Sequence, residues 1–168
     1  MPTHVRHYVT GDAAALIDVF VRSVRGLGPR DYTAAQVEAW VSRIGGPERT
    51  HARCSDGRLV LVAVDAADRP LAFIDLEDDG HIDMLFCVPE AAGTGVADAL
   101  YARLEEAARH RGTARLYTEA SEAARRFFLR RDFKVLRRRD FELGGVAIHN
   151  YAMEKPLASP GPRREDGR

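Results

Sequence analysis

Residues 81–98 of the chain read HIDMLFCVPEAAGTGVAD, and this stretch predicts the centre of the fold. An apolar segment leads to Pro89, then to Gly93 and Gly95, and from Val96 apolar residues recur at helical spacing. Glycine has no Cβ, so a ligand can closely approach the backbone N–H groups of such a loop. Because a helix N-terminus carries unpaired N–H donors and partial positive charge, the stretch predicts a phosphate cradle between a strand and a helix.

Spacing argues against two common phosphate-binding loops. A Walker loop has Lys followed by Ser or Thr directly after its second conserved glycine, and no such pair follows Gly95. A dinucleotide fingerprint has Gly or Ala three residues after the second glycine, where this chain has Asp98. A nucleotide-binding module for ATP or NAD is therefore disfavoured.

The order of strand and helix patterns along the rest of the chain predicts one α/β (α+β) domain over residues 1–157, with a disordered tail at 158–168. Thr33 and Gln36 form a predicted capping box, and residues 45–56 read as a loop. The segment from 81 to 88 should be the third strand of a meander, and the strand after the next helix should run parallel to it. The predicted strands are 5–9, 59–64, 71–76, 81–88, 114–118, 133–141 and 146–153, and the predicted helices 10–24, 33–44, 96–111 and 121–131.

Composition argues against several further classes of protein. The 25 basic and 25 acidic residues balance, so nothing drives the chain towards nucleic acid or an anionic membrane. The absence of a long apolar run or a signal-peptide segment leads us to expect a cytoplasmic protein. Cys54 and Cys87 are far apart in sequence, and His4 and His7 fall on opposite faces of a predicted strand. We therefore expect neither a disulfide framework nor a metal site.

Two segments carry a family resemblance. Residues 92–97, AGTGVA, resemble motif A of the GNAT superfamily of acyl-CoA N-acyltransferases, [QR]-x-x-G-x-[GA], with Ala92 at the leading Gln or Arg position. Residues 121–133, SEAARRFFLRRDF, resemble the second signature, N-x-x-A-x-x-[LF]-[YF]-x-x-x-G-F, with Ser121 for Asn and Asp132 for Gly. The resemblance covers about residues 3–156. It implies a GNAT-like fold, a mixed and mostly antiparallel twisted sheet of about seven strands flanked by about four helices.

The resemblance also implies acetyl-CoA as cosubstrate. The cradle would bind its pyrophosphate, and a backbone N–H of the preceding strand would polarise the thioester carbonyl as charge develops on the oxygen. Ser121 and Phe128 would contact the far end of the pantetheine arm. The residues implied for the cofactor are Phe86, Cys87 and Val88 on the strand and Ala92, Gly93, Thr94, Gly95, Val96 and Ala97 in the cradle.

The chemistry implied by the resemblance is direct attack of an amine on the thioester within a ternary complex. An alkylamine is protonated at neutral pH, so a general base assists. Asp83 and His81 stand two apart on one predicted strand, and His149 and Tyr151 on another, so each pair shares a face. Asp83 is the first candidate for the base and His149 the second.

The residues leave several candidates for the proton donor to the leaving thiolate. Family members often use a Tyr where this chain has Phe128, which has no proton to donate. Tyr151, Tyr117 or solvent would take that role. Cys87 in its apolar strand is expected to be a packing residue and not a nucleophile.

The sequence therefore predicts an N-acetyltransferase that acts on a primary amine of a small molecule or peptide. The alternative is a non-catalytic acyl-CoA-binding or ligand-sequestering module of the same fold. The acidic hairpin at 75–83 would favour a cationic amine, and the basic segment 125–139 would favour the CoA 3′-phosphate, although solvated charge explains both equally well. The acceptor and the oligomeric state, a homodimer included, stay open.

Overall fold

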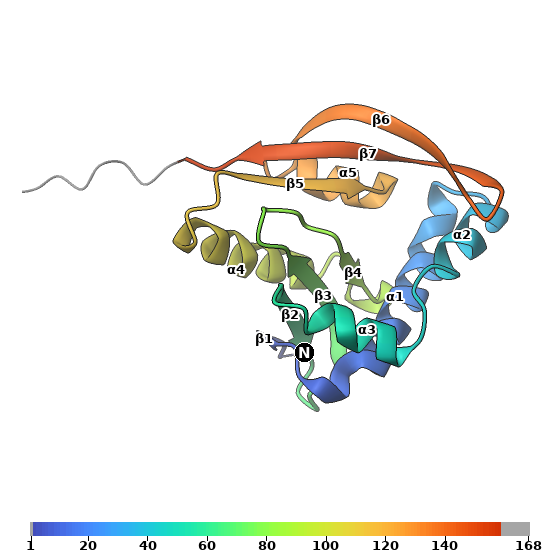
Figure 1. The fold of residues 1–168 in the computed structure, drawn as a ribbon. Coiled ribbons are helices and arrows are strands. Elements are labelled where there is room, and N and C mark those ends of the chain that lie inside the picture. Colours follow the sequence, from blue (N-terminus) through green and yellow to red (C-terminus); the bar gives the residue numbers. More distant parts are fainter. Residues whose placement is uncertain (1, 159–168) are drawn as a thin grey trace, which may run out of the picture.

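The structure, a computed structural model, describes residues 2–158, which form seven strands and five α-helices (Figure 1). Residues 159–168, most of the predicted tail, lie outside the described residues. The elements are β1 (His4–His7), α1 (Ala13–Leu27), α2 (Ala34–Val41), α3 (Pro47–Cys54), β2 (Leu59–Val64), β3 (Pro70–Leu76), β4 (Leu85–Cys87), α4 (Val96–His110), β5 (Arg115–Ala120), α5 (Glu122–Leu129), β6 (Lys134–Leu143) and β7 (Val146–Pro156).

The strands form two antiparallel sheets, in the orders β1-β2-β3-β4 and β5-β7-β6. A parallel bridge between His81 and Tyr117 joins them, as the predicted crossover requires. The Ile82 N–H donates to the Tyr117 carbonyl at 2.8 Å, and the Tyr117 N–H donates to the Gly80 carbonyl at 3.1 Å. Beyond this bridge β4 and β5 diverge, which Figure 1 shows as a V between the two sheets.

Gly80 makes this junction sterically feasible. Its φ is +95°, and a Cβ there would lie 2.0 Å from the carbonyl oxygen of Arg115. Any larger residue would push the turn away from β5, so glycine is required where the sheets meet.

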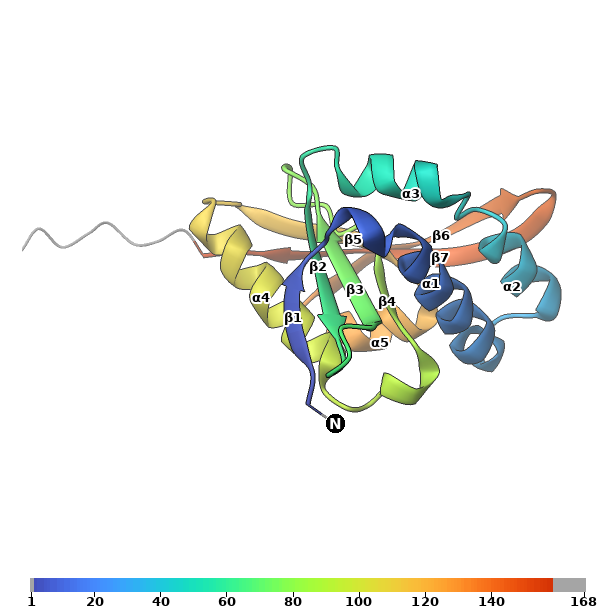
Figure 2. The same ribbon diagram turned by 90° about the horizontal axis from the view of Figure 1, so that it is seen from below.

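Helices α1 and α4 cover opposite faces of the first sheet (Figure 2). All six residues of β2 are buried, in keeping with its continuous apolar sequence, LVLVAV. Leu16 and Phe20 of α1 and Leu100 and Leu104 of α4 are at most 2% exposed. No helix within residues 2–158 combines the length and apolar character needed to span a bilayer.

The predicted strand over 81–88 is wrong in its first half, because only Leu85–Cys87 pair with β3. The cause is Asp75, whose carboxylate is 2% exposed. Its Oδ1 accepts the backbone N–H groups of Asp83 at 2.9 Å and Met84 at 2.8 Å, so these amides bond a side chain instead of a strand. The Asp75 N–H still donates to the Met84 carbonyl at 3.1 Å, so the ladder keeps one bond at this pair and regular strand pairing begins only at Leu85.

The 33–56 region also differs from the prediction, and most of the other elements begin or end a few residues from their predicted bounds. Residues 45–56 contain helix α3, which starts with Pro47 at its first position and buries only Thr50. Its sequence, PERTHARC, lacks apolar periodicity, so tertiary contact with α1 rather than local pattern accounts for it. Helix α2 ends at Val41 instead of residue 44, while its capping box between Thr33 and Gln36 is confirmed.

We predict that Asp75→Asn lowers the free energy of unfolding by about 3 kcal/mol. The substitution removes the buried negative charge that balances Arg53 and Arg58, whose guanidinium groups lie 2.6 and 3.0 Å from Oδ2. Urea unfolding measures the change. The control Asp78→Asn, in the exposed turn nearby, should stay within about 0.5 kcal/mol of wild type. An equal stability of both variants would contradict this role of Asp75.

Candidate active site

Two clefts lie where the sheets diverge. The cradle cleft, of about 240 Å³, lies between α1, β4, the 91–98 loop and α5, and its lining includes Ser23, Cys87, Gly93, Gly95, Phe127 and Arg130. The hairpin cleft, of about 350 Å³, lies between α2, the 81–86 segment and the β5-β7-β6 sheet. Its polar lining includes Arg43, His81, Asp83, Glu119, Arg139 and His149.

The two clefts share a wall made of four residues. Tyr32, Trp40, Phe86 and Ser121 line both. The rings of Trp40 and Phe86 lie edge to face with centroids 6.1 Å apart, and Tyr32 packs against Trp40 at 5.7 Å. Ligands in the two clefts would therefore contact the same four side chains, an arrangement that suits a transfer reaction between two bound molecules.

The predicted cradle is present at the start of α4. Gly95 occupies the N-cap position with φ +88°, and no side chain caps the helix. The N–H groups of Gly93, Gly95, Val96 and Ala97 have no acceptor among the described residues, and a Cβ added at either glycine would meet no atom within 4 Å. These open donors at a helix N-terminus fit a pyrophosphate.

The open edge of β4 supplies a further donor. The Val88 N–H donates to the Leu71 carbonyl at 2.9 Å, so the alternation of the ladder turns the amides of Leu85 and Cys87 away from β3. The Cys87 N–H lies 3.4 Å from the Ser23 hydroxyl oxygen, a long contact. Of the three strand residues predicted to pair with the cofactor, Cys87 is the one that presents its N–H to the cradle cleft.

The structure brings most of the other predicted cofactor residues to the same cleft. Phe86, Cys87, Ala92, Gly93, Gly95, Ala97 and Ser121 line it. Val88 and Val96 are buried, and the Thr94 hydroxyl donates to the Ala91 carbonyl at 2.5 Å.

Phe128 lies away from both clefts. It is 1% exposed and packs against Tyr101 and Phe133 in the core. Its neighbour Phe127 lines the cradle cleft instead. Because Ser121 caps α5, accepting the Ala124 N–H at 3.2 Å, the first turn of this helix also borders the cleft.

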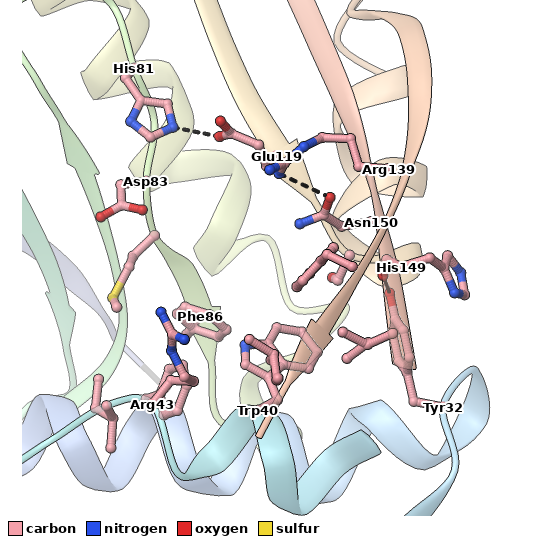
Figure 3. Close-up of a pocket in the computed structure, with 17 residues that line it drawn as sticks. Tyr32, Trp40, Arg43, His81, Asp83, Phe86, Glu119, Arg139, His149 and Asn150 are labelled. Atoms are coloured by element: carbon pink, nitrogen blue, oxygen red, sulfur yellow. Dashed lines mark hydrogen bonds and ion pairs between the residues drawn. The ribbon is translucent and has the colours of Figure 1, made fainter. Parts of the chain in front are cut away.

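His81 and Glu119 form an ion pair in the hairpin cleft (Figure 3). The Nε2 of His81 lies 2.6 Å from Glu119 Oε2, and its Nδ1 lies 3.0 Å from Glu77 Oε1. Glu119 is the main cause of a rise in the pKa of His81 to about 9, which burial opposes. His81 is thus an imidazolium at neutral pH and does not accept a proton there.

Asp83 faces the same cleft with one free oxygen. Its Oδ2 lies 2.8 Å from the Arg53 guanidinium and 3.3 Å from that of Arg58. Its Oδ1 has no partner among the described residues, and 40% of the side chain is exposed. His81 and Asp83 therefore share the cleft as predicted, although they do not lie on a common strand.

His149 and Tyr151 meet at Glu122. The His149 Nε2 lies 2.9 Å from Glu122 Oε1, and the Tyr151 hydroxyl donates to the same oxygen at 2.7 Å. His149 lines the hairpin cleft at the end opposite Asp83 (Figure 3), and Tyr151 lines neither cleft. The Tyr151 hydrogen bond to Glu122 raises the pKa of the Tyr151 hydroxyl.

Tyr32 and Glu119 are site residues that the sequence reasoning missed. The Tyr32 hydroxyl donates to the His149 carbonyl at 3.1 Å and accepts the Glu122 N–H at 3.0 Å, and burial raises its pKa to about 12. Its position before the capping box gave no functional signal. Glu119 stands two residues after Tyr117 on β5, and the predicted parallel pairing with the 81–88 segment was the one signal that could have found it.

Metal binding by these acidic residues is opposed by their own counter-ions. The ligand atoms of Glu77, His81 and Asp83 lie within 4.8 Å of one another. The Arg58 guanidinium, however, lies 3.5 Å from Glu77 and 3.3 Å from Asp83, so a cation of the protein already holds both carboxylates. Both cysteines are free thiols, and burial raises the pKa of Cys87 to about 11, which disfavours its thiolate.

Comparison with known proteins gives relatives over most of the chain. The chain is 33% identical to a GCN5-related N-acetyltransferase from Rhodopseudomonas palustris, with a TM-score of 0.85 over 94% of this chain and 97% of that one. It is 28% identical to the "Uncharacterized N-acetyltransferase YafP" of Escherichia coli (strain K12), over 89% of this chain and 93% of the relative.

A third relative shares the fold at lower identity. The PaiA N-acetyltransferase from Thermoplasma acidophilum, whose structure is a complex with coenzyme A, is 20% identical with a TM-score of 0.76, over 94% of this chain and all 100% of that one.

The second signature shows how a departure from the family pattern is accommodated. Asp132 stands where that pattern has glycine and adopts φ +66°, the left-handed conformation that glycine favours.

The family model for the acetyltransferase (GNAT) domain matches residues 29–155, which contain the cradle, the shared wall and both diverging strands. On this match the chain belongs to the GNAT family of acetyltransferases.

Proposed function

We propose that this chain transfers an acetyl group from acetyl-CoA to a primary amine of a small molecule, by direct attack in a ternary complex. One observation carries the proposal: two clefts meet at a shared wall, and one of them ends in a phosphate cradle. The hairpin cleft, of about 350 Å³, has the size of a small-molecule site. This favours a small acceptor over a folded protein.

Coenzyme A fits the cradle cleft in its chemistry. The free amides of Gly93, Gly95, Val96 and Ala97 match a pyrophosphate. The exposed Arg130 at the same cleft matches a further phosphate. The PaiA relative of the same fold holds coenzyme A, which supports the assignment. Acetyl-CoA, when bound, supplies the activated acetyl group as a thioester.

The chain's own residues would then orient and polarise the reactants. The Cys87 N–H at the open edge of β4 is the donor that we assign to the thioester carbonyl oxygen, where charge develops. The amine nitrogen forms the bond to the acyl carbon while the C–S bond breaks with its electrons on sulfur. An ammonium substrate loses two protons overall, one to the base and one that ends on the thiol.

Asp83 is the base that we propose, since its Oδ1 is unpartnered and faces the cleft. His81 is cationic at neutral pH and instead fixes Glu119. His149 and Tyr151, joined through Glu122, would hold Tyr32 at the shared wall. Neither Tyr117 nor Tyr151 lines a cleft, so we assign thiolate protonation to solvent, which is feasible for a thiol of pKa about 8.5.

The cradle assignment predicts selective stabilisation by CoA. Acetyl-CoA or CoA at a hundredfold excess over its dissociation constant should raise the stability by about 2.7 kcal/mol, and ATP and NAD at equal concentration should not. Ala97→Asp places a negative charge against the pyrophosphate at a position where helix N-termini tolerate acids, and should abolish the shift. Differential scanning fluorimetry measures it.

The control for this experiment is Ala99→Asp. Ala99 is exposed on the same helix and does not line the cradle cleft, so its variant should keep the full shift with acetyl-CoA. A shift that survives in Ala97→Asp, or one that ATP gives equally, would overturn the cradle assignment.

The base assignment predicts that Asp83→Asn lowers kcat about a hundredfold, with the KM for acetyl-CoA little changed. Thiol release with an amine acceptor measures both constants. Glu119→Gln, which changes a carboxylate held by His81 in the same cleft, should cost less than tenfold. If Glu119→Gln loses more activity than Asp83→Asn, the base is not Asp83. A chain that binds acetyl-CoA and consumes none with any amine would be the non-catalytic module.

A further inference from the structure

The charged groups of the hairpin cleft are unevenly partnered. Its two carboxylates are each held by a cation of the protein: Asp83 by Arg53 and Arg58, and Glu119 by His81. The cations Arg43 and Arg139 also line the cleft, and neither forms an ion pair with a carboxylate of the described residues. Arg139 does lie near enough to Glu119 to contribute to the lowered pKa of that carboxyl, after His81. The uncommitted charge in this cleft is therefore positive, contrary to the acidic mouth suggested by the sequence of the 75–83 hairpin.

Arg139 is held as a binding group would be. It lies directly opposite Asn150 in the β6–β7 ladder, and its Nη1 donates to the Asn150 Oδ1 at 3.2 Å (Figure 3). Its guanidinium carbon lies 5.6 Å from the ring centroid of Phe141. These contacts use one nitrogen and orient the plane. Nε and Nη2, the edge that binds a carboxylate in bidentate fashion, have no partner in residues 2–158.

Arg43 adds a second free guanidinium from the other side of the cleft. It follows α2, where its N–H donates to the Trp40 carbonyl at 3.1 Å, and Figure 3 shows its guanidinium directed towards Phe86. Apolar side chains, including Trp40, Ile44 and Phe86, line the same cleft. The cleft thus offers a fixed cation, an exposed cation and an apolar wall.

We propose that the acceptor is an amine that also carries a carboxylate, as an amino acid does, and that Arg139 binds this carboxylate. The inference rests on the proposed function and names the substrate class for that same site. The carboxylate takes no part in the bond changes. It fixes the acceptor so that the amine lies between Asp83 and the shared wall, while the apolar wall receives the side chain.

Matched pairs of acceptors test the proposal. Phenylalanine is compared with phenethylamine, leucine with isoamylamine and methionine with 3-(methylthio)propylamine, so that each pair differs by the carboxylate. With acetyl-CoA saturating, wild type should show at least a tenfold higher kcat/KM for the amino acid in one or more pairs. Arg139→Gln should remove this preference, mainly through the KM for the amino acid, so that the ratio of kcat/KM within each pair falls to about one.

Arg138→Gln is the matched control, because Arg138 lies next to Arg139 on β6, pairs with Asp140 and lines neither cleft. It should keep the preference. Equal rates within every pair, or higher rates for the simple amines, would overturn the carboxylate site.

A binding readout separates this proposal from the catalytic one. Calorimetric titration of CoA-loaded protein with the six acceptors should show tighter binding of the amino acids to wild type and to Arg138→Gln, and loss of the difference in Arg139→Gln. If no amine is acetylated but this pattern is seen, the proposed function fails and the carboxylate site stands. If acetylation occurs and neither rate nor affinity depends on the carboxylate, the carboxylate site fails alone.

Discussion

The carboxylate of Asp75 is the contact on which the shape of the site depends. It binds the amides of Asp83 and Met84 through one oxygen and Arg53 and Arg58 through the other. Burial raises the pKa of this carboxyl, and the two arginines and the Met84 amide oppose that shift. Asp75 takes the Met84 amide that would otherwise donate to the β3 backbone, so regular pairing with β3 stops at Leu85 and only the bond from the Asp75 N–H to the Met84 carbonyl remains at the next pair. The segment before β4 then turns towards β5, and the hairpin cleft opens beside it.

This constraint also explains how charge is distributed over the two clefts. Arg53 and Arg58 are drawn inwards to Asp75 and from there also reach Asp83, so acidic residues that look like an anionic patch in the sequence are neutralised by the protein. Arg43 and Arg139 come from elements distant in sequence and form no ion pair with the described residues, although the charge of Arg139 helps to lower the pKa of Glu119. The cradle cleft, by contrast, relies on backbone amides at the α4 N-terminus, with the exposed Arg130 as its cationic side chain.

Local features could be predicted from the sequence because short-range physics determines them. The strand over residues 59–64, the capping box of α2 and the glycine loop before α4 all appear as expected. Helix α3 and the 81–84 segment could not be predicted, because contact with α1 and the Asp75 side chain decide their conformations. The same holds for Tyr32 and Glu119, whose roles exist only where α2, β5 and the 81–86 segment converge. The second signature, at residues 121–133, also did not predict which of two neighbouring rings faces the cradle cleft. Phe127 lines that cleft and Phe128 is buried in the core.

Direct transfer between two ligands that touch at the shared wall is the central claim, and initial-rate kinetics test it. Acetyl-CoA and an amine acceptor are varied together, and the rate of thiol release is plotted in double-reciprocal form. The two-cleft arrangement predicts lines that intersect, because both ligands must be bound before the bond changes occur. Parallel lines would mean that the acetyl group is first stored on the protein, and would contradict the ternary complex and the packing role of Cys87.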